Sequence, residues 1–373
     1  MKKQGIFYFG DTETSGGVDR KVAAQLKSLN TPELGCRQIR YANYSRSLFN
    51  RLLFRLPFTN VYPRWTYSKE FDRADFVYFR RSHLSVHCLR VMKKIRRRNP
   101  EAKILYEIPT YPFKKELTAR WFDYPLWWKE YLCMLRIHRY VDRIVTMSDD
   151  EVICGVPTIR MVNGIDLETV RPIEPAPEDG AIHVVGVASI TRWHGYDRFL
   201  EGMGEYYRSG GRRNIVLHLV GTGTKKTMDG LRRLVERYRL ADRVIFHGYR
   251  TGEELDRIYD RCHLGLIALA TQDKDIHRHS TLKSREYLAK GLPTVSTGIT
   301  DVFENRDYKY NLRLPSDTVC VNMQDIVSFY DAVYGTMPRR QVIETIHCFA
   351  ASTIDVGITM APVIDYLLSD ARR

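Results

Sequence analysis

The sequence has few of the features that mark metal centres, disulfide frameworks or membrane spans. Its seven cysteines are widely scattered, and no two have the CxxC spacing of zinc and redox sites. No segment approaches the roughly 18 apolar residues of a transmembrane helix, and the apolar run before Asp11 is too short for a signal peptide. Internal repeats and low-complexity tracts are absent as well. We therefore expect a protein of the reducing cytoplasm, with at most a peripheral contact to the inner face of the plasma membrane.

The composition is that of a folded and strongly basic protein. Of the 373 residues, 44% are hydrophobic and 12% aromatic, and a chain of this length can bury two cores of ordinary size. The net charge of +14 indicates an anionic partner. Nucleic acid, an anionic membrane surface and a phosphorylated small molecule all fit, and charge alone does not choose among them.

A short helix is predicted over residues 282–290. Ser280 or Thr281 can cap its amino terminus, and the residues that follow are good helix formers. Gly291 suits a left-handed helix end, and Pro293 prevents continuation. The rest of the predicted site is organised around this helix.

The first turn of this helix is suited to an anion such as a diphosphate. The backbone amides at Thr281 and Leu282 carry the positive end of the helix dipole, and Lys283 adds a full charge beside them. Glu286 lies on the same side about 4.5 Å further along the axis, where its carboxylate could accept both hydroxyls of a ribose. The alternative is a solvated Lys/Glu pair on a surface helix.

Motifs along nearly the whole chain resemble those of the family 4 glycosyltransferases, which use nucleotide-sugar donors and have the GT-B fold. In chain order they are Gly16-Gly17, Asn163-Gly164-Ile165-Asp166, His194-Gly195-Tyr196-Asp197, Gly221-Thr222-Gly223, Gly248 after Phe246-His247, and the helix from Lys283 to Pro293. Their order and spacing are typical of the family. The resemblance implies an α/β protein of the GT-B class, with two Rossmann-like doubly wound domains facing a central cleft.

The resemblance and the composition together divide the chain into two domains and a tail. Residues 1–170 would form the acceptor-side domain, and residues 181–345 the domain that binds the nucleotide-sugar. The linker between them is marked by Pro172, Pro175, Pro177 and Gly180. Residues 346–373 would cross back to the first domain.

Each half of the chain alternates strands with turns and helices, which is typical of parallel βαβ units. Strands are expected at residues 6–9, 75–80, 182–188, 215–220, 264–269 and 319–321. Helices are expected at residues 84–98, 121–140, 282–290 and 323–334. For the aromatic helix at 121–140 we expect core packing over most of its length.

The resemblance implies a site for the donor phosphates to which both domains contribute. Gly16 and Gly17 would let the backbone of the first domain approach the phosphates closely. Lys283 and either Arg192 or His194 would supply cations, because the leaving diphosphate gains negative charge in the transition state. A histidine serves there only when it is protonated or donates a hydrogen bond.

Two further segments belong to the implied donor site. The backbone around Tyr249 and Arg250 would face the nucleobase, and Gly221 and Gly223 follow a neighbouring strand. Glu286 would hold the ribose. The sequence thus predicts a donor site at the carboxyl ends of the strands of the second domain.

Three positions depart from the family pattern. The family usually has two glutamates here, and the first of them is replaced by Arg278 while the second is Glu286. The usual arginine and lysine of the first turn are replaced by Ser189 and His194. Sugar recognition through the first glutamate therefore does not carry over, and a degenerate, non-catalytic relative is an alternative.

The resemblance also implies a mechanism. Family 4 enzymes retain the anomeric configuration by front-side attack, in which the leaving diphosphate takes the acceptor proton. Neither a protein base nor a cofactor is then required. If this enzyme inverts instead, a base must come from the first domain, with Glu107 or Asp11 as the candidate. For Glu107, a structural carboxylate at the end of a strand is the alternative.

The acceptor is expected to be a glycan or a lipid-linked glycan in the synthesis of a surface polysaccharide. This expectation rests on residues 44–73, which are rich in Arg, Tyr, Phe and Trp, a mixture that suits an anionic membrane surface. A surface segment that packs on its own domain is the alternative.

Other functions are less consistent with the sequence. A nucleotide-sugar epimerase of the same fold would need acid and base carboxylates near the donor, and a basic nucleic-acid binder would show salt-dependent affinity. His277 and His279 flank Arg278 and make a poor metal site, so we expect no metal.

Overall fold

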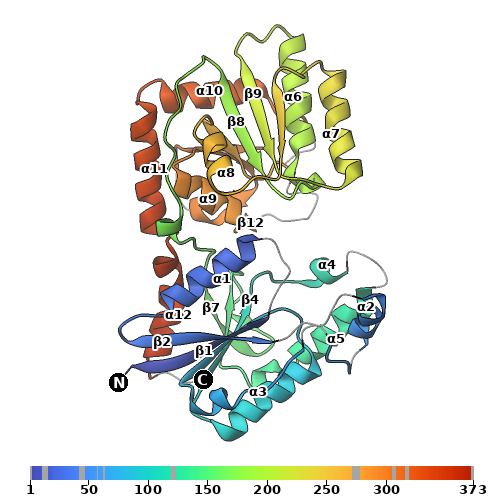
Figure 1. The fold of residues 1–373 in the computed structure, drawn as a ribbon, viewed down its shortest axis with the longest axis vertical. Helices are drawn as coiled ribbons and strands as arrows, with labels where there is room; N and C mark the ends of the chain where they lie inside the picture. The colour runs from blue at the N-terminus through green and yellow to red at the C-terminus, as the bar shows by residue number, and fades with distance from the viewer. Residues whose placement is uncertain are drawn as a thin grey trace. The chain divides into compact units, whose positions relative to one another are not determined.

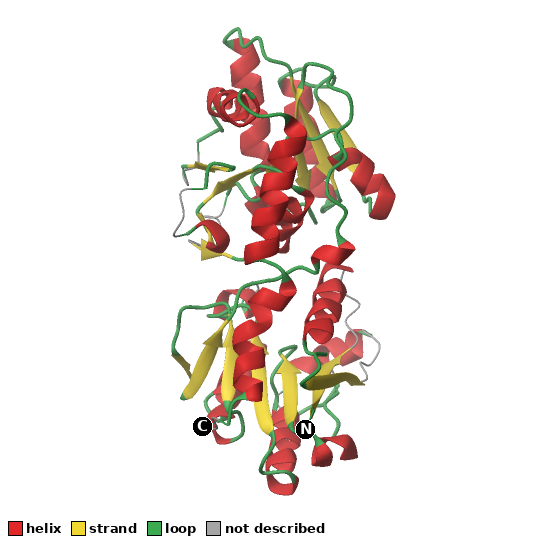
Figure 2. Cartoon of the chain, turned by 90° about the vertical axis from the view of Figure 1, so that its left-hand side faces the viewer, coloured by secondary structure: helices red, strands yellow, loops and turns green. Residues whose placement is uncertain are grey.

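The chain forms two units, each built on its own sheet. The computed structural model describes residues 2–10, 16–41, 47–56, 58–61, 64–118, 123–270, 278–304, 308–315 and 319–370. Its contacts define a first unit of Met1–Val162 with Val356–Arg373, and a second unit of Asn163–Asp355. Helices lie against both faces of each sheet (Figure 1 and Figure 2). The expected α/β class with parallel sheets is confirmed.

The described strands of the first unit form a seven-stranded sheet in the order β2-β1-β3-β4-β5-β7-β6. They are β1 (Lys3–Gly10), β2 (Leu34–Tyr41), β3 (Phe76–Arg80), β4 (Lys103–Ile108), β5 (Arg143–Thr146), β6 (Val152–Ile153) and β7 (Val156–Arg160). All of these strands pair in parallel except β6 with β7. β3 and β4 are buried along their whole length because helices cover both faces, which explains their nearly continuous apolar sequences.

The helices of the first unit come from both ends of the chain. They are α1 (Gly16–Ser28), α2 (Leu48–Arg55), α3 (Val86–Arg98), α4 (Lys114–Leu117), α5 (Tyr124–Met134) and α12 (Val356–Leu368), with the 3-10 helices η1 (Lys69–Arg73) and η3 (Ile137–Arg139). α12 packs beside α1. Its carboxyl end is held at the sheet by Lys3, whose Nζ donates to the carbonyl oxygens of Leu367 and Leu368, each at 2.9 Å.

The second unit has a parallel six-stranded sheet in the order β10-β9-β8-β11-β13-β15. Its strands are β8 (Ile182–Val187), β9 (Ile215–Val220), β10 (Val244–Gly248), β11 (Leu264–Leu266), β13 (Thr294–Thr297) and β15 (Asn311–Leu314), and β12 (Arg278–His279) pairs separately with β14 (Ile299–Thr300). The chain moves outward from β8 through β9 to β10 and then returns to the other side of β8. Ligands of open α/β sheets bind at the carboxyl ends of the strands where the order reverses in this way.

The helices of the second unit follow its strands. They are α6 (Tyr196–Arg208), α7 (Lys225–Arg237), α8 (Gly252–Tyr259), α9 (Leu282–Lys290), α10 (Met323–Tyr334) and α11 (Arg339–Thr353), with the 3-10 helices η4 (Leu167–Thr169), η5 (Arg192–His194) and η7 (Asp301–Phe303). No helix in the described part of the chain combines the length and the hydrophobicity that crossing a bilayer requires.

Two expected helices have the predicted bounds, and two other predictions are wrong. α9 and α10 begin and end where the sequence indicated. Residues 319–321 form no strand, because Arg198 holds them: its Nε donates to the carbonyl oxygen of Val319 (2.7 Å), and its carbonyl oxygen accepts from the amide of Val321 (3.1 Å). One helix was expected over residues 121–140. The described residues of this range form two helices instead, because the α-helix α5 ends at Met134 and the chain continues in the 3-10 helix η3.

Candidate functional site

Three loops meet at the carboxyl ends of the strands of the second sheet. The amide of Ile190, after β8, donates to the carbonyl oxygen of Thr222, after β9, at 2.7 Å. The amide of Leu269, after β11, donates to the carbonyl oxygen of His194 at 3.0 Å. These hydrogen bonds join loops that are far apart in the sequence, so the edge of the sheet presents one continuous backbone surface.

Gly221 and Gly223 make this close approach possible. Gly221 has φ +116°, and a Cβ there would lie 1.8 Å from the carbonyl oxygen of Ala188. A Cβ at Gly223 would lie 2.4 Å from the carbonyl oxygen of Ile190. Both glycines were predicted as donor-binding residues, and their immediate role in the fold is to let the loops after β8 and β9 touch.

The amino terminus of α9 lies within this group of loops. The Thr281 hydroxyl caps the helix by accepting from the amide of Ser284 at 3.3 Å. Gly291 ends the nine-residue helix in a left-handed conformation. Thr281 and Leu282 are only partly buried, so the first turn is accessible from outside the core. The helix therefore provides the local geometry that favours an anion.

Lys283 connects α9 to the turn after β8. Its Nζ donates to the carbonyl oxygen of Ile267 at 3.0 Å and lies 5.8 Å and 5.9 Å from the ring centres of Trp193 and Tyr196. Burial lowers the pKa of Lys283 to about 7, although the nearby charge of Glu286 opposes this change. The predicted phosphate-binding lysine thus lies beside the turn after β8, which carries the predicted residues Arg192 and His194.

Glu286 lies one turn further along α9 and is partly buried. Burial, and after it the charge of Glu286, raise the pKa of Tyr259 well above its usual value. Glu286 also raises the pKa of Lys283. Its carboxylate is therefore close to both side chains, and the order Lys283 then Glu286 along α9 is the one that the sequence predicted.

Arg285 organises the same helix end and was missed by the sequence analysis. Its side chain is fully buried, and it donates to Asp301 Oδ1 and Oδ2 at 2.7 Å and 2.6 Å. It also donates to the carbonyl oxygen of Asn163 (2.7 Å) and to Ser280 Oγ (3.1 Å). The residues just before α9 are thus fixed by a bidentate ion pair. The sequence offers no local signal for it, because the partners lie 16 and 122 positions away.

His194 has a structural role in the turn after β8. The ring is buried, and its Nδ1 accepts from the amide of Thr191 at 3.0 Å. It stacks on Tyr196 with 5.6 Å between the ring centres. With Nδ1 used as an acceptor, the neutral ring carries its proton on Nε2 and can offer only that N–H to a ligand.

The remaining predicted donor residues belong to the second unit. Ser189 and Arg192 are exposed in the turn after β8. Tyr249 is 64% exposed after β10, and the guanidinium of Arg250 donates back to the Tyr249 carbonyl oxygen at 3.0 Å. Arg278 pairs through its backbone with β14.

The predicted residues of the first unit are only partly described. Gly16 and Gly17 begin α1. Asp11 lies outside the described residues, as does His277 of the second unit. Among the residues that are described, no group of three or more His, Cys, Asp and Glu side chains is arranged to hold a metal ion.

Glu107 is the centre of a buried cluster. It is fully buried and accepts from Arg80 (2.6 Å), Lys21 (3.3 Å), Tyr78 (3.0 Å) and Gln25 (3.1 Å). Burial alone would raise the pKa of Glu107, but the charges of Arg80 and Lys21 and the hydrogen bonds outweigh it and lower the pKa to about 2. These contacts favour a structural carboxylate over a catalytic base.

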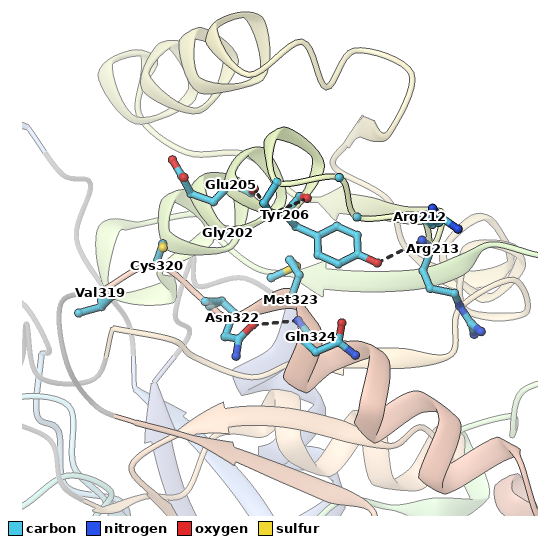
Figure 3. A pocket seen from close by; sticks show the side chains of 14 residues that line it. Gly202, Glu205, Tyr206, Arg212, Arg213, Val319, Cys320, Asn322, Met323 and Gln324 are labelled. Carbon is cyan, nitrogen blue, oxygen red and sulfur yellow. Dashed lines mark hydrogen bonds between the residues drawn. The ribbon is translucent and has the colours of Figure 1, made fainter.

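A cavity of about 710 Å³ in the second unit contains none of the predicted site residues. Side chains of α6 and of the start of α10 line it, among them Tyr206, Asn322 and Gln324 (Figure 3). The hydroxyl of Tyr206 accepts from the amide of Arg213 at 3.1 Å, and both residues line the cavity. A second cavity of about 630 Å³ does lie beside the predicted chemistry, because Gly221, Gly223 and His247 are among the residues that line it.

Comparisons with known proteins agree with the geometry of the second unit. Residues 181–336 match the family model described as "Glycosyl transferases group 1". No curated protein sequence matches the chain. Among solved structures, HepE of Anabaena in complex with UDP is similar over 98% of this chain and 99% of its own, with 11% identity and a TM-score of 0.63.

Two further structures show the same likeness. A glycosyltransferase of Rickettsia africae is similar over 100% of both chains, with 12% identity and a TM-score of 0.62. WaaG, a glycosyltransferase of lipopolysaccharide biosynthesis, is similar over 98% of this chain and 100% of its own, with 12% identity and a TM-score of 0.56. The likeness confirms the GT-B fold. Within this fold, residues 181–336 match the group 1 glycosyl transferases, which indicates a glycosyltransferase enzyme.

Proposed function

We propose that the chain transfers a sugar from a nucleotide-diphosphate donor to a glycan or a lipid-linked glycan. The observation that carries this proposal is the position of Lys283, at the accessible amino terminus of α9 and against the turn at Trp193 and Tyr196. A cation and helix amides that converge in this way are suited to a diphosphate. The HepE structures, which contain UDP and UDP-glucose, make UDP-sugars the first donors to test.

In the proposed site, the second unit, which contains the predicted donor domain 181–345, binds the donor, and the first unit receives the acceptor. Of the predicted tail 346–373, Val356–Arg373 belongs to the first unit. Gly16 and Gly17 approach the phosphates. The amides at Thr281 and Leu282 also hold the diphosphate. The carboxylate of Glu286 accepts hydrogen bonds from the ribose hydroxyls.

Lys283, with Arg192 or the Nε2–H of His194, stabilises the charge that develops on the leaving diphosphate. We propose retention of the anomeric configuration, with the leaving diphosphate taking the acceptor proton. This route needs no protein base, which agrees with the buried ion pairs of Glu107.

Titration calorimetry with UDP-sugars and GDP-sugars tests donor binding. Lys283→Ala and Glu286→Ala should each weaken binding about tenfold or more, because each removes a charged contact. Arg340→Ala is the matched control, since this arginine is exposed on α11 and pairs with the neighbouring Glu344. Equal affinities for wild type and both site variants would contradict the proposed site. Binding without transfer would indicate a non-catalytic relative.

We also propose that the first unit contacts an anionic membrane surface. Apart from Val152 and Ile358, the exposed large apolar residues described in this unit gather on α2, α5 and the segments that follow them: Phe49, Leu56, Phe58, Tyr124, Trp128, Tyr131, Leu132 and Leu135. α2 is fixed to the base of α5 by the ion pair of Arg55 with Asp123 (2.7 Å). Aromatic and apolar side chains on a basic protein suit the interface of a bilayer.

Vesicle sedimentation tests this contact. Vesicles that contain an anionic lipid should retain the protein, and neutral vesicles should retain less of it. Replacing Trp128 and Leu132 by Ser should release it, because both side chains are exposed and their loss leaves the core intact. Equal binding of the double variant would show that another surface makes the contact.

A further inference from the structure

Four histidines of the second unit form a continuous hydrogen-bonded network. His183 on β8, His218 on β9 and His247 on β10 lie on neighbouring strands, and His263 precedes β11. Nδ1 of His183 is 2.9 Å from Nε2 of His218, and Nδ1 of His218 is 2.9 Å from Nε2 of His247. The three rings thus form a row across the sheet toward the end of β10.

Asp179 gives this row a direction. Its carboxylate lies 3.0 Å from His183 Nε2, and its Oδ1 accepts from the amide of Ala181 at 3.0 Å. A carboxylate only accepts, so His183 donates through Nε2, and in its neutral form the ring leaves Nδ1 as an acceptor. His218 then donates through Nε2, and so does His247. Every ring therefore carries its proton on Nε2, and Nδ1 of His247 is a bare acceptor.

His263 belongs to the network but does not share the path. Its Nδ1 accepts from the backbone amide of His183 at 3.0 Å, and its Nε2 lies 2.9 Å from Glu178. The backbone amide of His183 is always a donor, whichever nitrogen of the His183 ring carries the proton. A change at Glu178 therefore cannot alter the tautomer of His247 through His263. Glu178 is therefore an internal comparison for Asp179.

The surroundings keep His218 and His247 neutral. Burial, and then the neighbouring His183 and His247, lower the pKa of His218 to about 3. Burial, and then Arg250 and Arg261, lower the pKa of His247. Around His263 lie Arg339, Glu178 and the rings of Tyr330 and Tyr334. At neutral pH the rings of His218 and His247 thus each have one proton, and the position of that proton is the variable.

We infer that Asp179 is a positioning residue that fixes, through His183 and His218, the tautomer of His247. His247 is two residues before Tyr249, at the loop for which the family resemblance implies nucleobase contact, so this step rests on the proposed function. A fixed acceptor there suits a nucleobase that offers a ring N–H, as uracil and guanine do. Asp179 would then influence donor selection from the opposite end of the sheet.

The tautomers can be measured directly, without a ligand. In Asp179→Asn, the Asn Oδ1 keeps the Ala181 amide and Nδ2 donates to His183 Nε2, so all three rings should move their proton to Nδ1. Two-dimensional NMR that correlates the ring nitrogens with the carbon-bound ring protons distinguishes N–H from bare nitrogen for each ring. Asp179 is exposed, so its replacement leaves the core packing intact.

Two further variants complete this experiment. Glu178→Gln should leave the His247 tautomer unchanged. In His218→Gln the path is cut, and Asp179→Asn should then have no effect on His247. A His247 that carries its proton on Nδ1 in the wild-type protein, or that ignores Asp179→Asn, would overturn the inference.

The role in donor binding has a separate readout. With UDP as the probe, Asp179→Asn should weaken binding about three- to tenfold, the value of one hydrogen bond, and Glu178→Gln should not. A reversed tautomer with unchanged UDP affinity overturns the nucleobase contact and keeps the positioning by Asp179. Absence of UDP binding to wild type would instead contradict the proposed function.

Discussion

Arg285 and Asp301 form a buried bidentate ion pair beneath the first turn of α9, with N–O distances of 2.7 Å and 2.6 Å. Arg285→Ala would leave the nearly buried carboxylate of Asp301 without its partner, and we expect a loss of about 3–5 kcal/mol in the free energy of unfolding. Urea denaturation measures this loss. Arg257→Ala, which removes an exposed pair with Glu253, should cost under about 1 kcal/mol. Similar costs for the two variants would show that the buried pair is not a stabilising contact.

Local features of α9 were predictable from the sequence, because they depend on neighbouring residues. The cap at Thr281, the helix formers after it and the left-handed Gly291 all act within one or two turns. The parallel sheets followed from the alternation of strands and helices. The family resemblance then supplied the GT-B fold, which local patterns alone do not determine.

Contacts between distant segments were not predictable. The sequence predicted that Gly221 binds the donor. In the structure, a Cβ at this position would collide with the carbonyl oxygen of Ala188, so the glycine is needed for contact between two loops. The row from His183 to His247 exists only because three strands place single histidines side by side. The strand expected at 319–321 does not form, because the distant residue Arg198 binds this segment through hydrogen bonds. Such contacts need the register of the sheet, which the sequence does not state.

Lys283 should make donor binding depend on pH. Its pKa is about 7 in the free protein, mainly because burial disfavours the ammonium. A bound diphosphate favours the ammonium, so above pH 7 binding must take up a proton. We expect the affinity for UDP-glucose to fall as the pH rises from 7 to 9, by up to about tenfold per pH unit. Titration calorimetry measures this affinity at each pH. UDP-glucose is a better probe than UDP, because the phosphates of UDP-glucose do not titrate in this range.

The matched control for this pH dependence is Lys283→Arg. Arginine keeps its charge throughout the range, so the affinity of this variant should vary little between pH 7 and 9. The same slope in the variant and in wild type would assign the proton uptake to another group.

Acid should destabilise the protein through its buried histidines. Burial is the main cause that lowers the pKa of His218 to about 3 and that of His263 to about 4, from 6.5. Between pH 6.5 and about 4 the unfolded chain binds protons at these positions that the folded chain does not, so stability must fall as the pH falls. His218→Gln should reduce the slope by up to about 1.4 kcal/mol per pH unit in urea denaturation. His138→Gln, at an exposed histidine, should not change it.

Glu107→Gln separates the two roles that the sequence left open for this residue. As a structural carboxylate it holds the buried cations Arg80 and Lys21, so the variant should lose about 3–5 kcal/mol of folding free energy. The loss should shrink as the pH falls from 4.5 toward about 2, because the wild-type carboxylate, with its lowered pKa, also becomes protonated there. Urea denaturation of the variant and of Glu70→Gln, which carries an exposed ion pair, measures both effects.

A catalytic base would give the opposite pattern. Glu107→Gln would then keep its stability and lose sugar transfer by a factor of about 100 or more at saturating substrates. Since the carboxylate is fully buried and already accepts from four side chains, no proton of an acceptor hydroxyl can reach it without breaking the cluster. We therefore expect the folded fraction of Glu107→Gln to transfer sugar at a rate close to that of wild type. A large fall in the transfer rate with unchanged stability would instead show that Glu107 is the catalytic base.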